Sequence, residues 1–272
     1  MGILNVTPDS FSDGGQFVVR DQALQHVEVM IREGAAIIDI GGESTRPGAQ
    51  DVSAEQELER VIPVLEMIKQ RFDIPVSVDT SKSVVMQQAI AAGADMINDV
   101  RALQEDGALQ VCAGSEVDVC LMHMLGQPRT MQVNPSYANV VSDIADFFSQ
   151  RLTDCEQAGL SAERIWLDPG FGFGKTLEHN IELLQQLDEL NRFQLPLLVG
   201  MSRKTMIGAI LGDCPVAERL QGSVAAAVIA AMNGAKMLRV HDVKATVDAL
   251  KMVQAIKYKK TGLVPATGID HV

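Results

Sequence analysis

The sequence has few of the features that mark exported or membrane-bound proteins. It contains four cysteines in 272 residues and only 4% aromatic residues. No stretch approaches the ~20 consecutive apolar residues of a membrane span, and no basic segment followed by an apolar run opens the chain. The cysteines show no Cys-x-x-Cys spacing and lie within apolar or helical patterns. This arrangement favours reduced thiols in a cytoplasmic enzyme over disulfides or a zinc site.

Positive charge is scarce as well. The chain has 23 Lys and Arg residues against 35 Asp and Glu residues, a formal net charge of −12. Such a balance produces no overall field that would attract nucleic acid or an anionic membrane, so we expect neither as a partner. A small anionic substrate must therefore meet cations that the fold places locally. Most of the acidic excess is interpreted as solvated helix faces.

The chain is rich in short apolar runs that alternate with helical patterns. Apolar residues make up 47% of the sequence, and no Pro/Gly/Ser-rich linker divides it. The runs are apolar on both faces, as expected for strands of a parallel sheet covered by helices. Strands are predicted at 2–6, 36–40, 76–79, 96–98, 117–123, 165–168, 197–201 and 236–240. Helices are predicted at 21–33, 53–71, 82–92, 105–113, 140–158, 177–190, 203–211 with 217–233, and 243–258.

Eight successive strand–helix units predict an α/β fold of the (β/α)8 TIM barrel type. We expect a single domain over 1–272, with 261–272 as a C-terminal tail that carries no interpretable motif. Two helix starts carry capping signals. Ser53 with Gln56 predicts a capping box, and Thr80 or Ser81 is expected to cap the helix after the third strand.

Polar and glycine-rich residues follow the strands, whereas the loops that lead into the strands are short and plain. In a barrel of this type the carboxyl ends of the strands build the active site. The polar segments are NVTPDSFSDGG, GGESTRPG, DTS and ND after the first four strands, and DPGFGFGK, GMSRKT and RVHD after the last three. Neither of the glycine-rich segments DPGFGFGK and GMSRKT has the spacing of a phosphate-binding P-loop.

Several side chains in these segments suit a binding site. Asp168 follows an apolar strand without an intervening turn, which suits a buried carboxylate that accepts from a pair of donors. Arg239 and His241 alternate along the last strand and lie on the same side, where both could meet one anion. His123, at the end of the fifth strand, is interpreted as a structural or lining residue.

Taken together, the segments MGILNVTPDSFSDGG, GGESTRPG, SVDTSK, INDV, LMHM, LDPGFGFGK, GMSRKT and RVHD resemble the dihydropteroate synthase family, in its bacterial single-domain form. The resemblance covers nearly the whole chain. It implies condensation of 6-hydroxymethyl-7,8-dihydropterin pyrophosphate with p-aminobenzoate, giving 7,8-dihydropteroate and pyrophosphate with the help of Mg²⁺. It also implies a homodimer and sensitivity to sulfonamides. Members usually carry a short extension before the first strand, and without one we expect an effect on stability rather than on activity.

The resemblance assigns roles to individual residues. Pterin recognition would fall to Asp79, Asn98, Asp168, Lys204 and Arg239. p-Aminobenzoate would meet Thr45, Arg46, Pro47, Phe173 and Thr205. Asn5 would hold the metal, and Asn5, Arg239 and His241 would meet the pyrophosphate. The catalytic set is Asn5, Asp13, Lys204, Arg239 and His241, with Asp13 stabilising a cation formed by SN1-like loss of pyrophosphate.

Three other functions fit parts of the pattern. A pterin-dependent methyltransferase domain shares the fold, although the SFSDGG, STRPG and SRKT segments argue against it. A phosphosugar aldolase or isomerase also uses this barrel, but no Schiff-base lysine stands at a strand end. The third alternative is a catalytically silent pterin-binding protein, against which Asn5, Asp13, Arg46 and Lys204 speak.

Overall fold

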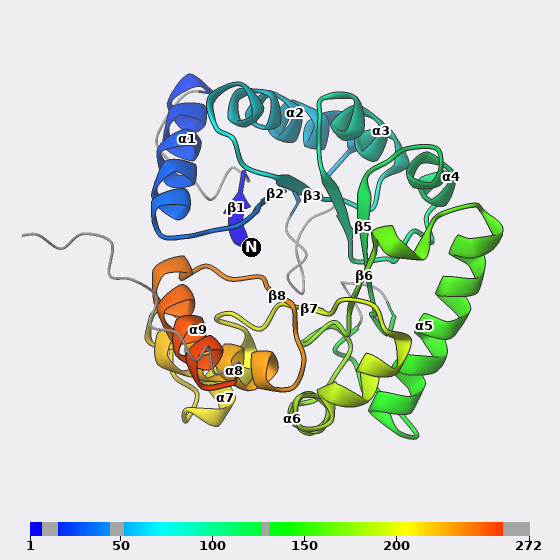
Figure 1. Ribbon diagram of the computed structural model, residues 1–272, viewed down its shortest axis with the longest axis vertical. Coiled ribbons are helices and arrows are strands. Elements are labelled where there is room, and N and C mark those ends of the chain that lie inside the picture. The colour runs from blue at the N-terminus through cyan, green and yellow to red at the C-terminus, as the bar shows by residue number, and fades with distance from the viewer. Residues whose placement is uncertain (7–15, 44–51, 127–130, 258–272) are drawn as a thin grey trace, which may run out of the picture.

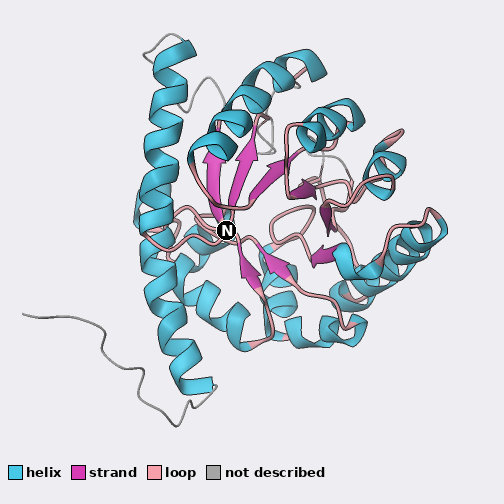
Figure 2. Ribbon diagram, turned by 45° about the horizontal axis from the view of Figure 1, so that its top comes forward, coloured by secondary structure: helices cyan, strands magenta, loops and turns pink. Residues whose placement is uncertain are grey.

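The structure is a ring of strands enclosed by helices. The computed structural model describes residues 1–6, 16–43, 52–126 and 131–257, with the backbone alone for 16–19. Strands and helices alternate along the chain, and the helices surround the strands (Figures 1 and 2). The predicted α/β barrel is thereby confirmed. The predicted domain bounds stay a prediction, and the tail 261–272 lies outside the described residues.

All strand pairs are parallel, and each strand pairs with its neighbour in sequence. Six strands form one sheet in the order β1 to β6, and two more form the pair β7–β8. The strands are β1 (Gly2–Asn5), β2 (Ile38–Gly41), β3 (Val76–Asp79), β4 (Met96–Asp99), β5 (Asp118–Met122), β6 (Ile165–Asp168), β7 (Leu198–Val199) and β8 (Met237–Leu238).

Two isolated bridges close the ring. Leu167 pairs with Leu197 between β6 and β7, and Gly2 pairs with Val240 between β8 and β1. The Ile3 N–H donates to the Val240 carbonyl at 3.1 Å. The regular parts of β7 and β8 are shorter than predicted, yet Arg239 N still donates to Val199 O at 2.9 Å. The backbone path thus continues past the named strands, and the side chains that follow them remain in the ring.

The outer layer consists of helices, most of which begin and end within three residues of the predicted positions, whereas the first begins at Gln16 rather than at 21 and the one predicted over 177–190 ends at Gln185. They are α1 (Gln16–Arg32), α2 (Ala54–Arg71), α3 (Ser83–Ala91), α4 (Ala108–Ala113), α5 (Val140–Gln157), α6 (Leu177–Gln185), α7 (Thr205–Ile210), α8 (Leu220–Met232) and α9 (Val243–Lys257). The predicted capping box of Ser53 and Gln56 is present at α2. The predicted cap of α3 is wrong, because Lys82 occupies the N-cap without a side-chain cap bond. Short 3-10 helices supplement these α-helices. They are η2 (Ala162–Arg164), η3 (Leu187–Phe193) and η4 (Val216–Glu218). η3 replaces the end of the helix predicted over 177–190.

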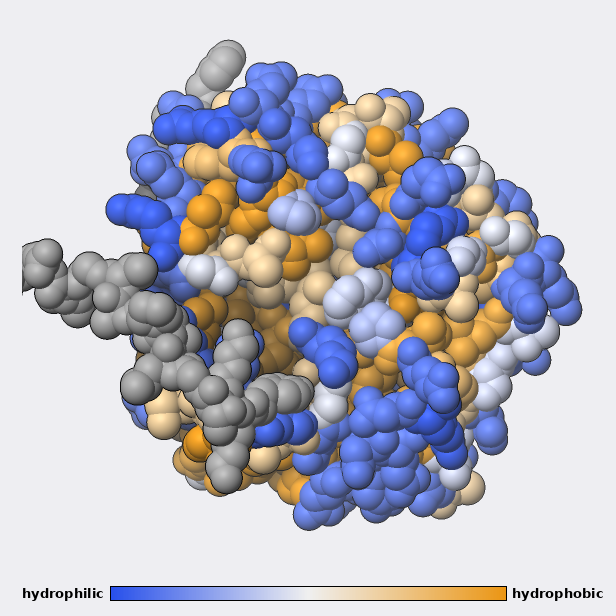
Figure 3. Space-filling view, in the orientation of Figure 1, coloured by the Kyte–Doolittle hydropathy of each residue, from blue (hydrophilic) through white to orange (hydrophobic). Residues whose placement is uncertain are grey.

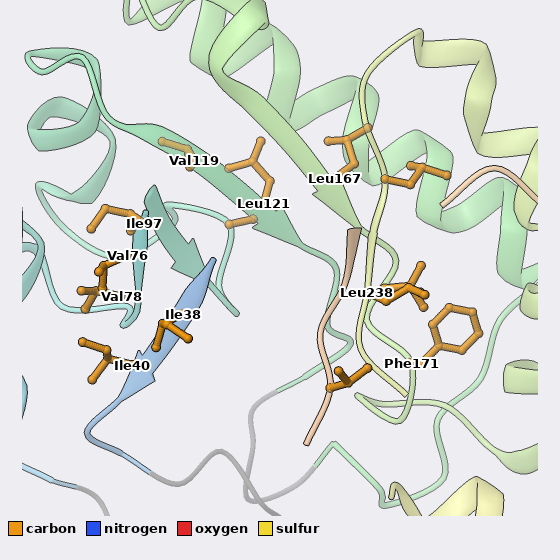
Figure 4. Packing of buried hydrophobic residues seen from close by; sticks show 14 of the residues in the cluster. Ile38, Ile40, Val76, Val78, Ile97, Val119, Leu121, Leu167, Phe171 and Leu238 are labelled. Atoms are coloured by element: carbon orange, nitrogen blue, oxygen red, sulfur yellow. The ribbon is translucent and has the colours of Figure 1, made fainter. Parts of the chain in front are cut away.

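Alternation along the strands separates two kinds of interior. One set of strand side chains packs outward against the helices and includes Ile38, Ile40, Val76, Val78 and Leu121 (Figure 4). The alternate positions point into the ring. Near the strand starts they form a separate apolar cluster of Met1, Ile37, Met96, Cys120 and Leu198, with Trp166 and Met237 packed against it. The ring is therefore filled by side chains rather than hollow.

The surface is mixed. In the orientation of Figure 1, apolar residues gather towards the middle of the visible face and hydrophilic residues lie around its edge (Figure 3). Within the described parts of the chain, no helix is both long and apolar enough to cross a membrane.

Candidate active site

Charged side chains occupy the ring interior near the carboxyl ends of the strands. Arg239, just after β8, forms ion pairs with one residue of β2 and one of β3, across the bridge between β8 and β1. Its Nε donates to Asp39 Oδ2 of β2 at 2.6 Å, and its Nη2 donates to Asp79 Oδ2 of β3 at 2.9 Å. A charge-assisted bond to each carboxylate fixes the plane of the guanidinium. A rigid, flat cation therefore lines the ring interior near the carboxyl ends of the strands.

Burial dominates the electrostatics of this cluster. It raises the pKa of Asp79 to about 7, and the Arg239 guanidinium only partly opposes that rise. Burial also acts to lower the pKa of Arg239, but Asp39 and Asp79 outweigh it and hold the guanidinium pKa above its usual range. Arg239 thus stays charged, whereas Asp79 can take up a proton near neutral pH.

Asp39 is a site residue that the sequence analysis missed. Its side chain is fully buried, and its Oδ1 has no hydrogen-bond partner. Asn98, at the end of β4, approaches Asp39 Oδ2 with its Nδ2 at 3.5 Å. A carboxylate in the middle of the apolar run 36–40 was the available signal, because a buried charge needs a partner. The identity of that partner depended on the closure of the ring, which brings residues 39 and 239 together.

A second charged pair faces the ring from β6 and the loop after β7. Asp168 is 5% exposed and accepts from Gly170 N at 2.8 Å. Burial raises its pKa, opposed chiefly by Lys204. Burial likewise lowers the pKa of Lys204 to about 8, and Asp168 opposes that shift. A buried carboxylate that can accept from a donor pair and a lysine that can donate therefore influence each other's pKa.

The Phe171 carbonyl and the Phe173 ring, both in the loop after β6, hold Lys204 in place. Its Nζ donates to Phe171 O at 2.5 Å and lies 4.3 Å from the centroid of the Phe173 ring, a cation–π distance. Thr205 is the exposed first residue of α7. Three predicted residues, Phe173, Lys204 and Thr205, therefore lie together at the mouth of the ring.

His241 is anchored to the loop after β7. Its backbone N–H and its Nδ1 lie 3.2 Å and 3.0 Å from the Ser202 hydroxyl oxygen. The sequence predicted that Arg239 and His241 could converge on one anion. In the structure Nε and Nη2 of Arg239 donate to Asp39 and Asp79, so these two donors bind carboxylates inside the ring.

Asn5 ends β1 on the rim of the ring. A Cβ placed on Gly41 would lie 3.6 Å from Asn5 Oδ1 and 3.9 Å from Asp79 Oδ2. The absence of a side chain at Gly41 therefore leaves the two oxygens facing one open position. Oxygen donors of this kind suit a hard cation such as Mg²⁺, which binds through one or two protein ligands together with water and substrate phosphates. No group of three His, Cys, Asp or Glu side chains that could hold a metal exists among the described residues.

Four predicted site residues, Asp13, Thr45, Arg46 and Pro47, lie outside the described residues. Glu43, the last described residue before 44–51, is held by two contacts. Lys82 makes an ion pair with Glu43 and donates to the buried Glu57 at 2.5 Å. Glu43 Oε1 also accepts from Val52 N at 3.3 Å, so the described residues on either side of 44–51 are joined to each other.

His123 and Lys175 form a buried pair behind this site. Their Nδ1 and Nζ atoms are 2.9 Å apart, and the side chains are 5% and 3% exposed. Burial and the Lys175 charge lower the pKa of His123 to about 2, so the imidazole is neutral. This agrees with the interpretation of His123 as a structural residue. Lys175 was missed, and its only signal was its place at the end of a glycine-rich run.

Comparison with known proteins finds close relatives over nearly the whole chain. Residues 1–241 match the family model described as pterin binding enzyme. Dihydropteroate synthase of Escherichia coli K12 is 57% identical over 255 residues, covering 94% of this chain and 90% of the relative. A crystal structure of the Yersinia pestis dihydropteroate synthase with a sulfonamide drug complex is 56% identical, with a TM-score of 0.91 over 95% of this chain and 94% of that chain. The Burkholderia cenocepacia enzyme complexed with 7,8-dihydropteroate is 47% identical, with a TM-score of 0.87 over 95% and 91%.

Proposed function

The chain belongs to the pterin-binding enzymes and, among them, to the dihydropteroate synthases, and from this premise we propose how its residues perform the reaction. The enzyme is a transferase that condenses 6-hydroxymethyl-7,8-dihydropterin pyrophosphate with p-aminobenzoate to give 7,8-dihydropteroate and pyrophosphate. One observation carries the residue assignment. The buried Asp168 carboxylate interacts electrostatically with Lys204, in a ring whose interior also holds the ion pairs of Arg239.

Pterin recognition follows from the polarity of the ring interior. A pterin presents a ring amide N–H next to an exocyclic amine, and the Asp168 carboxylate can accept both hydrogens. Asn98 and Asp79 read the remaining ring edge, and Lys204 donates to the acceptor side. Arg239 lies against the face of the pterin, because its guanidinium plane is fixed by two carboxylates and stacks on π systems. A buried site of this kind rejects rings that leave its polar groups unpaired.

Departure of pyrophosphate requires positive charge at the mouth of the ring. We assign that task to His241 and Arg239, with Asn5 as a ligand of Mg²⁺. When bound, the metal would supply Lewis-acid stabilisation of the leaving group. Loss of pyrophosphate leaves the methylene carbon electron-poor, and the pterin ring delocalises that charge. We therefore favour an SN1-like substitution in which Asp13 stabilises the cation.

The second substrate needs positioning more than activation, because an arylamine is largely unprotonated at neutral pH. Phe173 packs against one face of the p-aminobenzoate ring, and Thr45, Arg46 and Pro47 complete the pocket. The Thr205 hydroxyl meets the carboxylate. Since a sulfonamide mimics p-aminobenzoate, we propose that it inhibits this enzyme by competing for the same pocket, a role consistent with the sulfonamide complex of the Yersinia pestis relative.

We further propose that the enzyme works in the cytoplasm as a homodimer. The cysteines support the first point, since Cys112, Cys120 and Cys155 are buried and none of the described cysteines is paired. Burial raises the pKa of Cys112 to about 12, which keeps the thiol protonated and unreactive.

The direct test supplies the enzyme with the pterin pyrophosphate and Mg²⁺, with and without p-aminobenzoate, and measures the release of pyrophosphate. The pterin product is identified by mass. Dihydropteroate should form only when all components are present. Binding of the pterin without any product would instead favour a silent pterin-binding protein.

The metal ligand has a separate test. Replacing Asn5 with Ala should lower kcat by at least about tenfold and leave the affinity for the pterin without pyrophosphate within about twofold, because only the leaving group meets the metal. Equal turnover of Asn5→Ala and the wild type at limiting Mg²⁺ would remove Asn5 from the metal site.

A further inference from the structure

Lys175 lies outside the strands of the ring and is nevertheless buried, which is rare for a lysine. It closes the segment DPGFGFGK after β6 and is 3% exposed. Its ammonium lies within 2.9 Å of Gly170 O, 3.1 Å of Phe173 O and 2.9 Å of His123 Nδ1. An ammonium has three hydrogens and no acceptor. In the protonated form the three neighbours therefore use all three hydrogens, although burial lowers the pKa of Lys175 to about 7.

Two of these acceptors belong to the loop itself. The carbonyls of Gly170 and Phe173 stand on either side of Phe171, whose own carbonyl accepts from Lys204. A single cation thus fixes the loop at both ends of the stretch that carries Phe171 and Phe173. Because the Phe173 carbonyl is one of these acceptors, Lys175 holds the backbone from which the Phe173 ring projects, and that ring lies 4.3 Å from the Lys204 ammonium.

The backbone of the loop permits little adjustment. Gly170, Gly172 and Gly174 all have positive φ values, of 70°, 78° and 62°. A Cβ on Gly170 would lie 1.9 Å from His123 O, and one on Gly174 would lie 2.4 Å from Leu125 O. The loop therefore lies directly on the backbone that follows β5, and the buried Lys175 connects the two segments through His123.

His123 is suited to this role only as a neutral acceptor. Burial and the Lys175 charge lower the pKa of its imidazole to about 2, so the ring is neutral. The tautomer with its hydrogen on Nε2 presents a lone pair at Nδ1 to Lys175 Nζ, 2.9 Å away. Its ring packs edge-on against Phe147, with the centroids 5.0 Å apart. That contact fixes the orientation of the imidazole and directs Nδ1 to the ammonium.

We propose that Lys175, oriented by His123, is a positioning residue that sets Phe173 against p-aminobenzoate. The inference rests on the proposed contact between Phe173 and that substrate. Lys175 acts through the loop and touches neither substrate. Asp79 and Asn98, on β3 and β4, share none of the hydrogen bonds of Lys175, whereas Asp168 is linked to it through Gly170, whose N–H donates to Asp168. We therefore expect loss of Lys175 to affect p-aminobenzoate more than the pterin.

The test is a comparison of the two KM values. Replacing Lys175 with Met keeps an unbranched side chain about as long as the aliphatic part of lysine and removes all three hydrogen bonds. We expect the KM for p-aminobenzoate to rise about tenfold, the loss that corresponds to one hydrogen bond from a charged donor. The KM for the pterin pyrophosphate should change less than about threefold. A matched control is Lys69→Met, which removes an exposed lysine paired with Asp95 and should leave both KM values unchanged.

Substitutions of His123 keep the proposal testable if Lys175→Met does not fold. His123→Asn places an amide oxygen close to the position of Nδ1 and should retain the wild-type KM for p-aminobenzoate. His123→Leu removes the acceptor and should raise that KM. Equal KM values for His123→Asn and His123→Leu, or a parallel rise of both substrates' KM values in Lys175→Met, would show that the pair stabilises the fold without positioning Phe173.

Phe173→Ala separates this proposal from the proposed function. If Phe173→Ala leaves the KM for p-aminobenzoate unchanged, the assumed contact is wrong, and the route from Lys175 to the substrate is wrong with it. If Phe173→Ala raises that KM and Lys175→Met does not, the pocket assignment stands and only the positioning role fails. A rise in both variants supports the two together.

Discussion

At the scale of single residues, burial controls the charge states on which pterin recognition depends. Arg239 remains charged because two carboxylates contact it, whereas Asp79 and Asp168 have raised pKa values because the ring interior excludes water. Burial brings the pKa values of Asp79 and Lys175 to about 7, and Lys204 is the group assigned to the pterin whose charge changes on the alkaline side of neutral pH. Burial lowers its pKa to about 8, although Asp168 partly opposes that shift.

This shift predicts a pH dependence. Lys204 donates best when protonated, so kcat/KM for the pterin pyrophosphate should fall as the pH rises through about 8, the pKa of the free enzyme. In Lys204→Arg the guanidinium stays charged over this range, and the decline should disappear even if the maximum is lower. Steady-state kinetics between pH 6.5 and 9.5 would test this expectation, and an identical decline in Lys204→Arg would assign it to another group.

At the scale of elements, the loops after the strands are joined to one another as well as to their own strands. The loop after β6 lies on the backbone after β5 through Gly170. The loop after β7 is joined to the one after β8, because Arg203 donates to both oxygens of Asp242 at 2.8 Å and 2.5 Å. Such cross-links place side chains from distant parts of the sequence with the accuracy that binding requires.

The close approach at Gly170 can be tested with alanine. Gly170→Ala should lower the free energy of unfolding by at least about 3 kcal/mol, because the new Cβ meets His123 O and φ is positive. Gly212→Ala is the control, since φ there is 77° and no atom lies within 4 Å of the added Cβ. Only the backbone term of about 1 kcal/mol should be lost there. Equal losses in urea denaturation would mean that the loop after β6 can move away from β5.

At the scale of the whole molecule, the site exists because the ring closes. Asp39 and Asp79 from the first half of the chain meet Arg239 from the end of it, across the bridge between β8 and β1. In the proposed binding mode, a pterin contacts both halves of the chain at once. Binding therefore stabilises the closed ring against unfolding.

Thermal unfolding should reveal this linkage. A pterin without pyrophosphate, present at 100 times its Kd, should add about 2.7 kcal/mol of stability and raise Tm by roughly 5–10 °C. In Asp168→Asn the increase at the same ligand concentration should largely vanish, because an amide cannot accept both hydrogens of the donor pair. An undiminished increase in Asp168→Asn would place the pterin elsewhere.

The sequence by itself determined the class of fold and the family. Apolar runs and helical periodicity are local properties, so the strands at 76–79 and 165–168 and the capping box at Ser53 could be predicted without tertiary information. The position of polar residues after strands identified Asp168 as a candidate, because every strand of a parallel barrel ends at the same face. The roles of Asn98 and Lys204 were implied by the family resemblance.

Only the tertiary structure decided which of these groups pair. Asp39 and Arg239 are separated by 200 positions, and no local pattern indicates that closure of the ring brings them within hydrogen-bonding distance. The pairing of Lys175 with His123 likewise depends on the packing of one loop against the backbone after β5. Local sequence sets the strands and helices, whereas the partners of buried charges are chosen by contacts between elements far apart in the chain, because a charge removed from water is stable only where the fold supplies its counterpart.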